Sequence, residues 1–253
     1  MKNIFLSGCP RSGTTALWKL FASEPKIAMG LERFKNRCRN EKFSLEESLY
    51  AKKRFFDMQD GDTHFKDLVS GEGGKYYAEL KGRFDKCELV GDKLPNLYRF
   101  LPEVSKSFSN AKTIVIVRNV FDVAQSYEAR LRNEKDKWDR DFKDGVNEWN
   151  VSVRKTLANL GPNVHVLIYE DFFFTKGTEH IHKLEEFLDF KFSAEFFNTH
   201  KALVNQSLEK DKSRHGILSS RNKLFISKNA NFGIYKKLIN AISHDQKDPV
   251  LAK

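Results

Sequence analysis

Hydrophobic residues fall into short, nearly unbroken runs, separated by longer stretches in which apolar positions recur every three or four residues. Short apolar runs are typical of parallel strands that are buried on both faces, and the longer spacing is typical of amphipathic helices. The expected strands are Ile4–Leu6, Lys26–Met29, Glu88–Val90, Thr113–Val117 and Val164–Tyr169. This alternation predicts an α/β fold, with a parallel sheet of the P-loop type flanked by helices.

Helical spacing and capping patterns place several helices between these strands. Ser44 is followed three residues later by Glu47, the pattern of a capping box, which predicts a helix to about Phe56. Residues 76–86 and 135–160 are also expected to be helical. Thr178 precedes another periodic apolar stretch and is expected to cap its helix.

Three stretches lack a periodic pattern. Asp60 to Lys75 contains four glycines and predicts a long loop. Lys201 to Lys237 is basic and carries few signals before a final helix near Tyr235. The last residues, about 245–253, are expected to form a frayed tail. No linker-rich segment divides the chain, so residues 1–253 are expected to form a single domain.

The segment after the first apolar run has the spacing of a phosphate-binding loop. Gly8 and Gly13 match the nucleotide-triphosphate pattern G-x-x-x-x-G-K-[ST], but Thr14 occupies the position of the lysine. Kinases and ATPases need that lysine on the β- and γ-phosphates of ATP. Its absence therefore argues against phosphoryl transfer, and a small-molecule or nucleotide kinase with an unusual loop is kept as an alternative.

The same loop nevertheless predicts an anion site. A helix that begins at the second glycine would present free backbone N–H groups and the positive end of its dipole. Ser12, Thr14 and Thr15 add hydroxyl donors, and Arg11 adds a cation.

A second anion site is predicted after the fourth apolar run, which ends at Arg118. Asp122, Ser126 and Arg130 follow at intervals of four and would stack along one side of a helix. Two guanidinium groups and a hydroxyl form a strong phosphate site. The alternative is an amphipathic helix whose arginine pairs with Asp122 or Glu128.

Composition limits the partners without selecting one. Forty-four Lys and Arg against 34 Asp and Glu leave a formal charge of +10, which suits an anionic ligand, a nucleic acid or an acidic membrane surface. The aromatic residues are mostly phenylalanine in apolar surroundings, as in a core. No nucleic-acid motif is present, so no nucleic-acid partner is expected, and a basic nucleic-acid-binding protein is the alternative from another class.

Cysteine and histidine usage gives weaker indications. Cys9, Cys38 and Cys87 form no C-x-x-C pair, which favours a reducing compartment, and the seven histidines suggest no metal site. No apolar run reaches the ~18 residues that cross a bilayer. We therefore expect a soluble, cytoplasmic protein, although a trimmed luminal domain would have the same features.

Two motifs resemble those of the sulfotransferases that use 3′-phosphoadenosine-5′-phosphosulfate (PAPS). The stretch Pro10-Arg11-Ser12-Gly13-Thr14-Thr15 resembles their 5′-phosphosulfate loop. The pattern Val117-Arg118-Asn119-x-x-Asp122-x-x-x-Ser126 resembles their 3′-phosphate motif, although Asn119 replaces the commoner aspartate. The resemblance implies PAPS as co-substrate, a hydroxyl-bearing acceptor and no metal.

The resemblance also implies catalytic roles. Glu32 stands in a Gly-x-Glu setting similar to that of the general base in tyrosylprotein sulfotransferases. From the residues alone, Glu32 fits a solvated carboxylate paired with Arg33 or Arg37. Lys93 lies in an Asp-Lys-x-Pro segment that resembles one whose lysine assists catalysis, and together with Arg11 it would neutralise charge on the sulfuryl group and leaving phosphate.

Three further residues are implied as donor contacts. Tyr169-Glu170-Asp171 resembles a family segment whose tyrosine lies near the nucleotide, although a structural role for Tyr169 fits equally well. Ser213 and Lys228 are candidates for a loop that folds over adenosine. We expect sulfuryl transfer to an acceptor hydroxyl, with a carbohydrate or small molecule favoured and a peptide tyrosine kept as an alternative. The basic run between Arg33 and Arg39 favours an acidic acceptor or is merely solvated.

Overall fold

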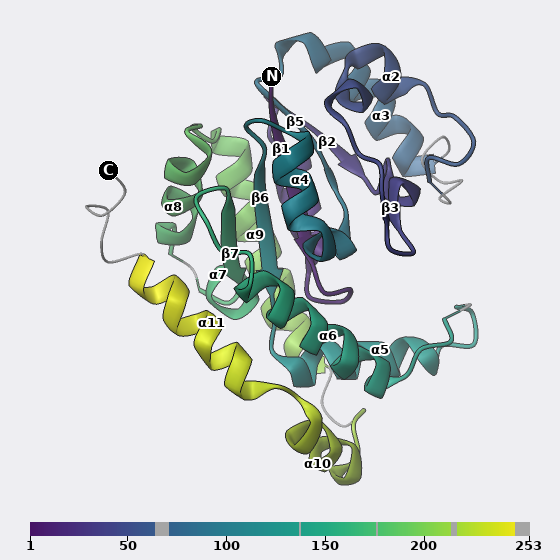
Figure 1. Ribbon diagram of the computed structural model, residues 1–253, viewed down its shortest axis with the longest axis vertical. Helices are drawn as coiled ribbons and strands as arrows, with labels where there is room; N and C mark the ends of the chain where they lie inside the picture. The colour runs from purple at the N-terminus through teal and green to yellow at the C-terminus, as the bar shows by residue number, and fades with distance from the viewer. Residues whose placement is uncertain (64–70, 137, 176, 214–216, 246–253) are drawn as a thin grey trace.

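Five parallel strands form the centre of the computed structural model, which describes residues 1–63, 71–136, 138–175, 177–213 and 217–245 (Figure 1). Their order across the sheet is β2-β5-β1-β6-β7, so β1 lies in the middle. The strands are β1 (Lys2–Gly8), β2 (Ile27–Leu31), β5 (Leu89–Lys93), β6 (Lys112–Val117) and β7 (Val164–Ile168). The predicted α/β class with a parallel sheet is confirmed.

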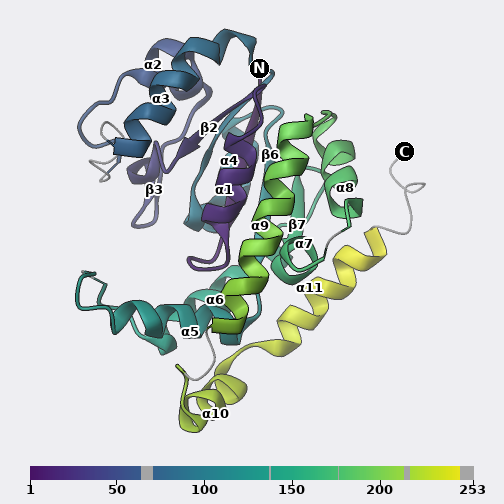
Figure 2. The ribbon, with the colours of Figure 1, turned by 180° about the vertical axis from the view of Figure 1, so that it is seen from behind.

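Helices cover both faces of this sheet because neighbouring strand residues point to opposite sides. Ile4 and Leu6 pack with one apolar cluster and Phe5 with another. Figure 2 shows the first face, which is covered by α1 (Thr14–Ala22), α8 (Glu179–Leu188) and α9 (Ala194–Ser213). Elements on the opposite face include α4 (Leu101–Ser107), α5 (Val120–Leu131) and α6 (Phe142–Leu157).

The strand register brings the functional segments to one edge. Lys93 lies beside Leu6 of β1 and Leu31 of β2, and Val117 of β6 lies beside Ile168 of β7. The segments that follow these strands therefore emerge at the same edge, where ligands of open parallel sheets bind. This edge carries the phosphate-loop segment, Glu32, Arg118 and Tyr169.

The helix predicted from Ser44 to Phe56 is broken. A 3₁₀ turn over Glu47–Tyr50 ends at Ala51, whose extended backbone (ψ 140°) separates it from the short helix α2 (Lys52–Phe56). No side chain caps either element. The hydroxyl of Ser44 instead donates to the carbonyl oxygen of Arg37, at 3.3 Å. These two residues flank the hairpin of β3 (Cys38–Arg39) and β4 (Lys42–Phe43), which brings them together.

The loop predicted for 60–75 ends earlier than expected. Helix α3 (Gly71–Arg83) already includes three of its four glycines, and residues 64–70 lie outside the described part of the chain. Tertiary contacts override the poor helix propensity of glycine here. The Tyr76 hydroxyl donates to the carbonyl oxygen of Met29 at 2.7 Å, and the Tyr77 hydroxyl accepts from the amide of Leu31 at 2.9 Å.

The final helix expected near Tyr235 is present, but the expectation of little regular structure before it was wrong. Helix α9 extends to Ser213, followed by α10 (Ser220–Asn229) and α11 (Phe232–Asp245). Basic residues dominate these helices, and their few buried apolar residues, which include Val204, Ile226 and Leu238, gave no clear helical periodicity in the sequence. Of the predicted tail, residue 245 closes α11 and residues 246–253 lie outside the described residues.

Two other helices also differ from expectation. The helix predicted over 135–160 begins only at Phe142, after Asp141, whose carboxylate accepts from the amides of Lys143 and Asp144. Thr178 precedes α8 but makes no capping hydrogen bond. Within the described segments, no helix is long and apolar enough to cross a membrane.

Candidate active site

The loop between β1 and α1 is shaped by two glycines and is closely packed against β6 and against Tyr169, the residue after β7. Gly8 has φ 152° and Gly13 has φ 100°. A Cβ atom on Gly13 would lie 2.5 Å from the ring of Tyr169, so no larger residue fits there. The buried hydroxyl of Ser12 donates to the carbonyl oxygen of Ile116 at 3.2 Å. Ser12 therefore fastens the loop to β6 and does not line the cavity described below.

The first turn of α1 opens into a cavity of about 160 Å³. Gly13 is the N-terminal cap residue and no side chain caps the helix. Thr14, Thr15 and Ala16 line the cavity. Because the amides of a first helical turn lack intrahelical acceptors and carry the positive end of the dipole, this wall attracts an anion.

Two arginines, Arg11 and Arg118, also line this cavity, whereas the sequence had paired Arg118 with Arg130. The Arg11 Nε donates to the hydroxyl of Ser126 at 3.0 Å, and the Arg118 guanidinium lies 4.2 Å from the ring centroid of Tyr169. Arg118, which follows β6, also pairs with Asp122 in the first turn of α5, at 3.0 Å. Arg11, Arg118, Ser126 and Tyr169 all line the cavity, so segments more than 100 residues apart meet at one anion site.

Arg130 lies in a neighbouring cavity of about 440 Å³, which shares Arg11 and Ser126 with the first. It forms a two-pronged ion pair with Asp136 and lies 4.2 Å from the ring centroid of Trp138. Arg118 and Arg130 thus face adjoining cavities rather than the same one.

Helix α9 supplies residues that the sequence did not indicate. Gln206 and Ser207 line the smaller cavity, and the hydroxyls of Ser207 and Tyr169 lie 3.0 Å apart. The sequence did not predict these two residues as part of the site, because the basic stretch around them showed no convincing helical pattern. Of Ser213, only the backbone at the end of α9 is described, and Lys228 is exposed on α10 and lines neither cavity.

Glu32 and Lys93 meet at the ends of β2 and β5. Their side chains are buried, and the Lys93 Nζ lies 2.6 Å from the Glu32 Oε1. The backbone amide of Glu32 also donates to the carbonyl oxygen of Lys93 at 3.0 Å, and Lys35 pairs with the second carboxylate oxygen. The alternative for Glu32, a solvated carboxylate paired with Arg33 or Arg37, is therefore not what the structure shows.

Burial and charge oppose each other in this pair. Burial raises the pKa of Glu32, but Lys93 and Lys35 outweigh it and hold the pKa below its usual value. Glu32 is therefore a carboxylate at neutral pH. For Lys93 the signs are reversed, because burial disfavours the charged ammonium: burial lowers the pKa of Lys93, and Glu32 offsets only part of that effect.

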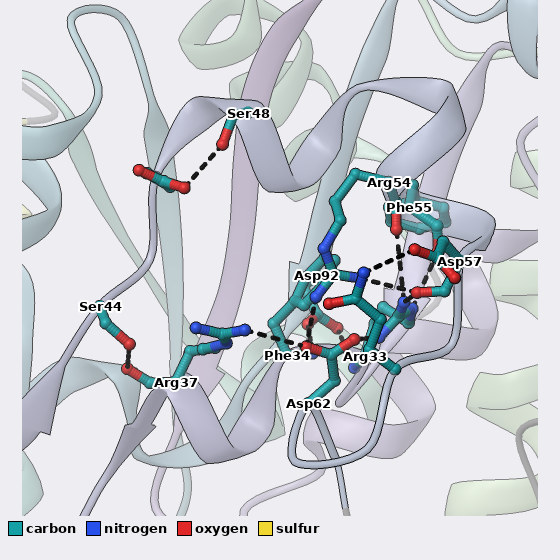
Figure 3. A network of polar contacts seen from close by, with 12 residues as sticks. Arg33, Phe34, Arg37, Ser44, Ser48, Arg54, Phe55, Asp57, Asp62 and Asp92 are labelled. Carbon is teal, nitrogen blue, oxygen red and sulfur yellow. Dashed lines mark hydrogen bonds and ion pairs between the residues drawn. The ribbon is translucent and has the colours of Figure 1, made fainter.

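The side chain of Arg33 pairs with Asp62, not with Glu32, in a buried network (Figure 3). Its Nη1 lies 2.8 Å from the Asp62 Oδ2, and both side chains are completely buried. Arg33 also donates to the carbonyl oxygens of Phe55 and Asp57, at 2.9 and 2.7 Å. Arg54 and Arg37 pair with the other oxygen of Asp62. This network anchors the segment 54–62 beside the Glu32 turn.

The described part of the chain contains no group of three or more His, Cys, Asp or Glu side chains arranged to hold a metal ion. The residues that are present offer cationic groups at the loop and an ionised carboxylate at Glu32.

Comparison with known proteins gives concordant matches. The chain is 24% identical over 208 residues to a Caenorhabditis briggsae protein named "Putative protein-tyrosine sulfotransferase", covering 79% of this chain and 70% of that protein. Similar solved structures include mouse sulfotransferase SULT7A1 complexed with PAP (14% identity, TM-score 0.49, 98% and 84% of the two chains). Another is the sulfotransferase domain of the Synechococcus PCC 7002 olefin synthase (21%, 0.49, 79% and 78%).

The model of the sulfotransferase family matches residues 3–194, which include both anion-binding motifs, Glu32 and Lys93. That match spans well over half of the chain. The chain belongs to the sulfotransferase family, and it is an enzyme that transfers a sulfuryl group.

Proposed function

We propose that the enzyme takes the sulfuryl group from PAPS and transfers it to an acceptor hydroxyl, with Glu32 as the general base. The observation that carries this proposal is the cavity in which the first turn of α1 faces Arg11, Arg118 and Ser126. A donor phosphorylated at both its 5′ and 3′ ends needs two anion-binding walls of this kind. The loop would hold the 5′-phosphosulfate, and Arg118 with Ser126 the 3′-phosphate.

Glu32 has the protonation state that a base requires, because Lys93 and Lys35 keep its pKa low. The carboxylate would accept the acceptor's hydroxyl proton as that oxygen forms its bond to sulfur. The bond between sulfur and the bridging oxygen of the donor breaks in the same step, and its electron pair stays on the departing phosphate.

Positive groups would stabilise the charge that collects on this phosphate. Arg11 faces the cavity and Lys93 lies one strand away, beside β1. Together with the amides of the α1 first turn they would stabilise the sulfuryl oxygens and the departing phosphate through fixed, preorganised donors. Tyr169, with Gln206 and Ser207 of α9, would complete the wall around the nucleotide.

A second cleft supports an acceptor that carries negative charge. It has a volume of about 620 Å³ and lies between the β3–β4 hairpin and the segment after β5. Its lining includes four cationic side chains and two acidic ones: Arg39, Arg99, Arg140, Lys155, Glu41 and Glu103. Cys38 of the hairpin lines this cleft and interacts electrostatically with Lys35 and Glu32, so the cleft adjoins the surroundings of the proposed base. Its cationic side chains would attract an acidic acceptor.

The donor is tested directly with radiolabelled PAPS in the presence of a metal chelator. Label is expected to move to an acceptor, whereas ATP with Mg²⁺ should transfer no phosphate. Adenosine 3′,5′-bisphosphate (PAP) should raise the melting temperature of the protein. Metal-dependent phosphate transfer from ATP, with no response to PAP, would instead establish the kinase alternative.

The acceptor is tested with a matched panel: p-nitrophenol, a neutral sugar glycoside, the same glycoside with a carboxylate, and a tyrosine peptide with and without flanking aspartates. The peptide is included because the C. briggsae relative is named for tyrosine. Within each pair, the charged member is expected to have the lower KM. Equal KM values for charged and neutral members would refute the acidic-acceptor proposal.

A further inference from the structure

Asp92 is a completely buried carboxylate that holds the backbone just after Glu32 (Figure 3). It is the residue before Lys93 in β5, and its two oxygens accept different amides. Oδ1 accepts from the amide of Arg33 at 3.0 Å, and Oδ2 accepts from the amide of Phe34 at 2.9 Å. One carboxylate thus binds two consecutive N–H groups of the turn.

This turn has a backbone conformation that needs such support. Glu32 has φ 53°, in the left-handed region that residues other than glycine rarely adopt. A conformation of that kind persists only when the surroundings hold it from several sides. Here the amide of Glu32 donates to the carbonyl oxygen of Lys93, while Asp92 binds the next two amides.

The surrounding packing leaves Asp92 little freedom. A Cβ atom on Gly30 would lie 2.7 Å from its Oδ1, so the β2 backbone passes directly over the carboxylate. The end of β5 therefore presents two adjacent side chains with different tasks. Asp92 fixes the path of the backbone, and Lys93 meets the carboxylate of Glu32.

We infer that Asp92 is a positioning residue, which holds Glu32 in the left-handed turn that directs its carboxylate toward Lys93. This inference rests on the proposed role of Glu32 as the base. Asparagine in place of Asp92 would lose one of the two acceptors, because its amide nitrogen donates and cannot bind an N–H group. The turn would then relax toward an ordinary backbone conformation and move the base.

The protonation of Asp92 gives this role a pH signature. Burial raises its pKa to about 7, although the amides of Phe34 and Arg33 oppose the shift. Above that pH the carboxylate accepts both amides, whereas below it a proton occupies one oxygen. Turnover is therefore expected to fall as the pH falls through about 7, while the pKa of Glu32 itself stays below its usual value.

Other ionisable groups also face Asp92 and belong to the same electrostatic environment. They are Lys93 of β5, Cys38 of β3, Tyr50 of the 3₁₀ turn, Tyr76 and Tyr77 of α3, and Glu32, Arg33 and Lys35 of the segment after β2. For the thiol and the phenols, burial raises the pKa further from neutrality, so they do not titrate near pH 7.

The test compares D92N with the wild type and with E24Q, using PAPS and the best acceptor of the panel above. D92N is expected to lower kcat roughly 100-fold, the cost of a base displaced by about 1 Å. The Kd of D92N for PAP should stay within twofold of wild type, and the fall of its kcat as the pH drops through about 7 should disappear.

E24Q is the matched control, because Glu24 is a buried carboxylate that accepts the Ser193 amide at 2.8 Å, on the helix-α1 side. Its kcat and pH profile should not change.

G30A provides a second variant, because its methyl group presses on the same carboxylate oxygen. It should repeat the loss of kcat without loss of PAP binding.

The inference is overturned if D92N retains kcat within threefold, if PAP affinity and kcat fall in parallel, or if the kcat of the wild type does not fall with pH between pH 8 and 6. If the wild type transfers nothing from PAPS, or E32Q remains active, the proposed function itself fails.

Discussion

The two halves of the site handle charge in opposite ways. Beside β1, β6 and β7, two arginines and an uncapped helix end face a cavity. Beside β2 and β5, every main charge is buried against a partner: Glu32 with Lys93, and Arg33 with Asp62. A wall that receives a charged donor from water must keep positive charge in excess. A base that must stay ionised and correctly oriented is held by internal partners instead.

Exposure shows the same contrast. Arg118 is 7% exposed, but its partner Asp122, in the first turn of α5, is 29% exposed, so a ligand phosphate can replace that carboxylate. The pair of Arg33 and Asp62 is 0% exposed on both sides, and neither residue can lose its partner without leaving a buried charge. We call the region around Arg11 and Arg118 the donor half, and the region around Glu32 and Lys93 the base half. Mutations in the donor half are expected to change the Kd for PAP. Mutations in the base half are expected to change kcat or the free energy of unfolding.

The largest expected effect comes from E32Q. Removal of a general base costs about 10²- to 10⁴-fold in rate. The variant should lose turnover by that factor and keep the wild-type Kd for PAP, measured by calorimetry. If E32Q lost PAP binding together with turnover, Glu32 would belong to the donor half, and the division of the site into two halves would be contradicted.

Substitution D62N tests the buried network. It leaves the Arg33 guanidinium without its carboxylate, which should lower the free energy of unfolding in urea by about 3 kcal/mol. The control D85N breaks an exposed pair with Lys52 and should leave stability unchanged. An equal effect of the two substitutions would show that burial does not distinguish the halves.

The pKa of Asp62 adds a pH test to this variant. Burial raises the pKa, but Arg54 and Arg33 outweigh it and leave it below its usual value. Its contribution to stability is therefore complete above about pH 4, the pKa of an unfolded aspartate, and is lost as the pH falls further. The stability difference between wild type and D62N should shrink in that acid range.

R118M is expected to weaken PAP binding by roughly 10- to 150-fold, the value of a charge-assisted hydrogen bond. R132M is the matched control, because Arg132 lies at the C-terminal end of α5, pairs with Glu128 and lines neither cavity. Its Kd for PAP should equal that of the wild type. Equal affinities of R118M and wild type would remove Arg118 from the 3′-phosphate site.

The smallest expected effect is that of D122N. It removes a carboxylate that competes with phosphate for Arg118, and pairs of this kind contribute only a few tenths of a kcal/mol. PAP should bind about twofold more tightly. Weaker binding would mean that Asp122 orients Arg118 for the donor rather than competing with it.

Local pattern sufficed for the strands and for the residues at their ends. The loop from Gly8 to Thr15, Arg118 and Lys93 were predicted in position because strand ends of a parallel sheet share one edge. Helix boundaries were predicted less well. Ala51 interrupts one expected helix, and glycines enter α3, because contacts from distant segments outweigh local propensity.

By itself, the sequence determined the fold class, the anion loop and the spacing of Arg118 to Ser126, all of which depend on short-range periodicity. Only the tertiary structure decided that Ser207 meets Tyr169, that Arg33 pairs with Asp62, and that Asp92 holds the turn. These contacts join residues 29 to 59 positions apart in the chain. No local pattern encodes them, because each depends on how the elements pack around the sheet.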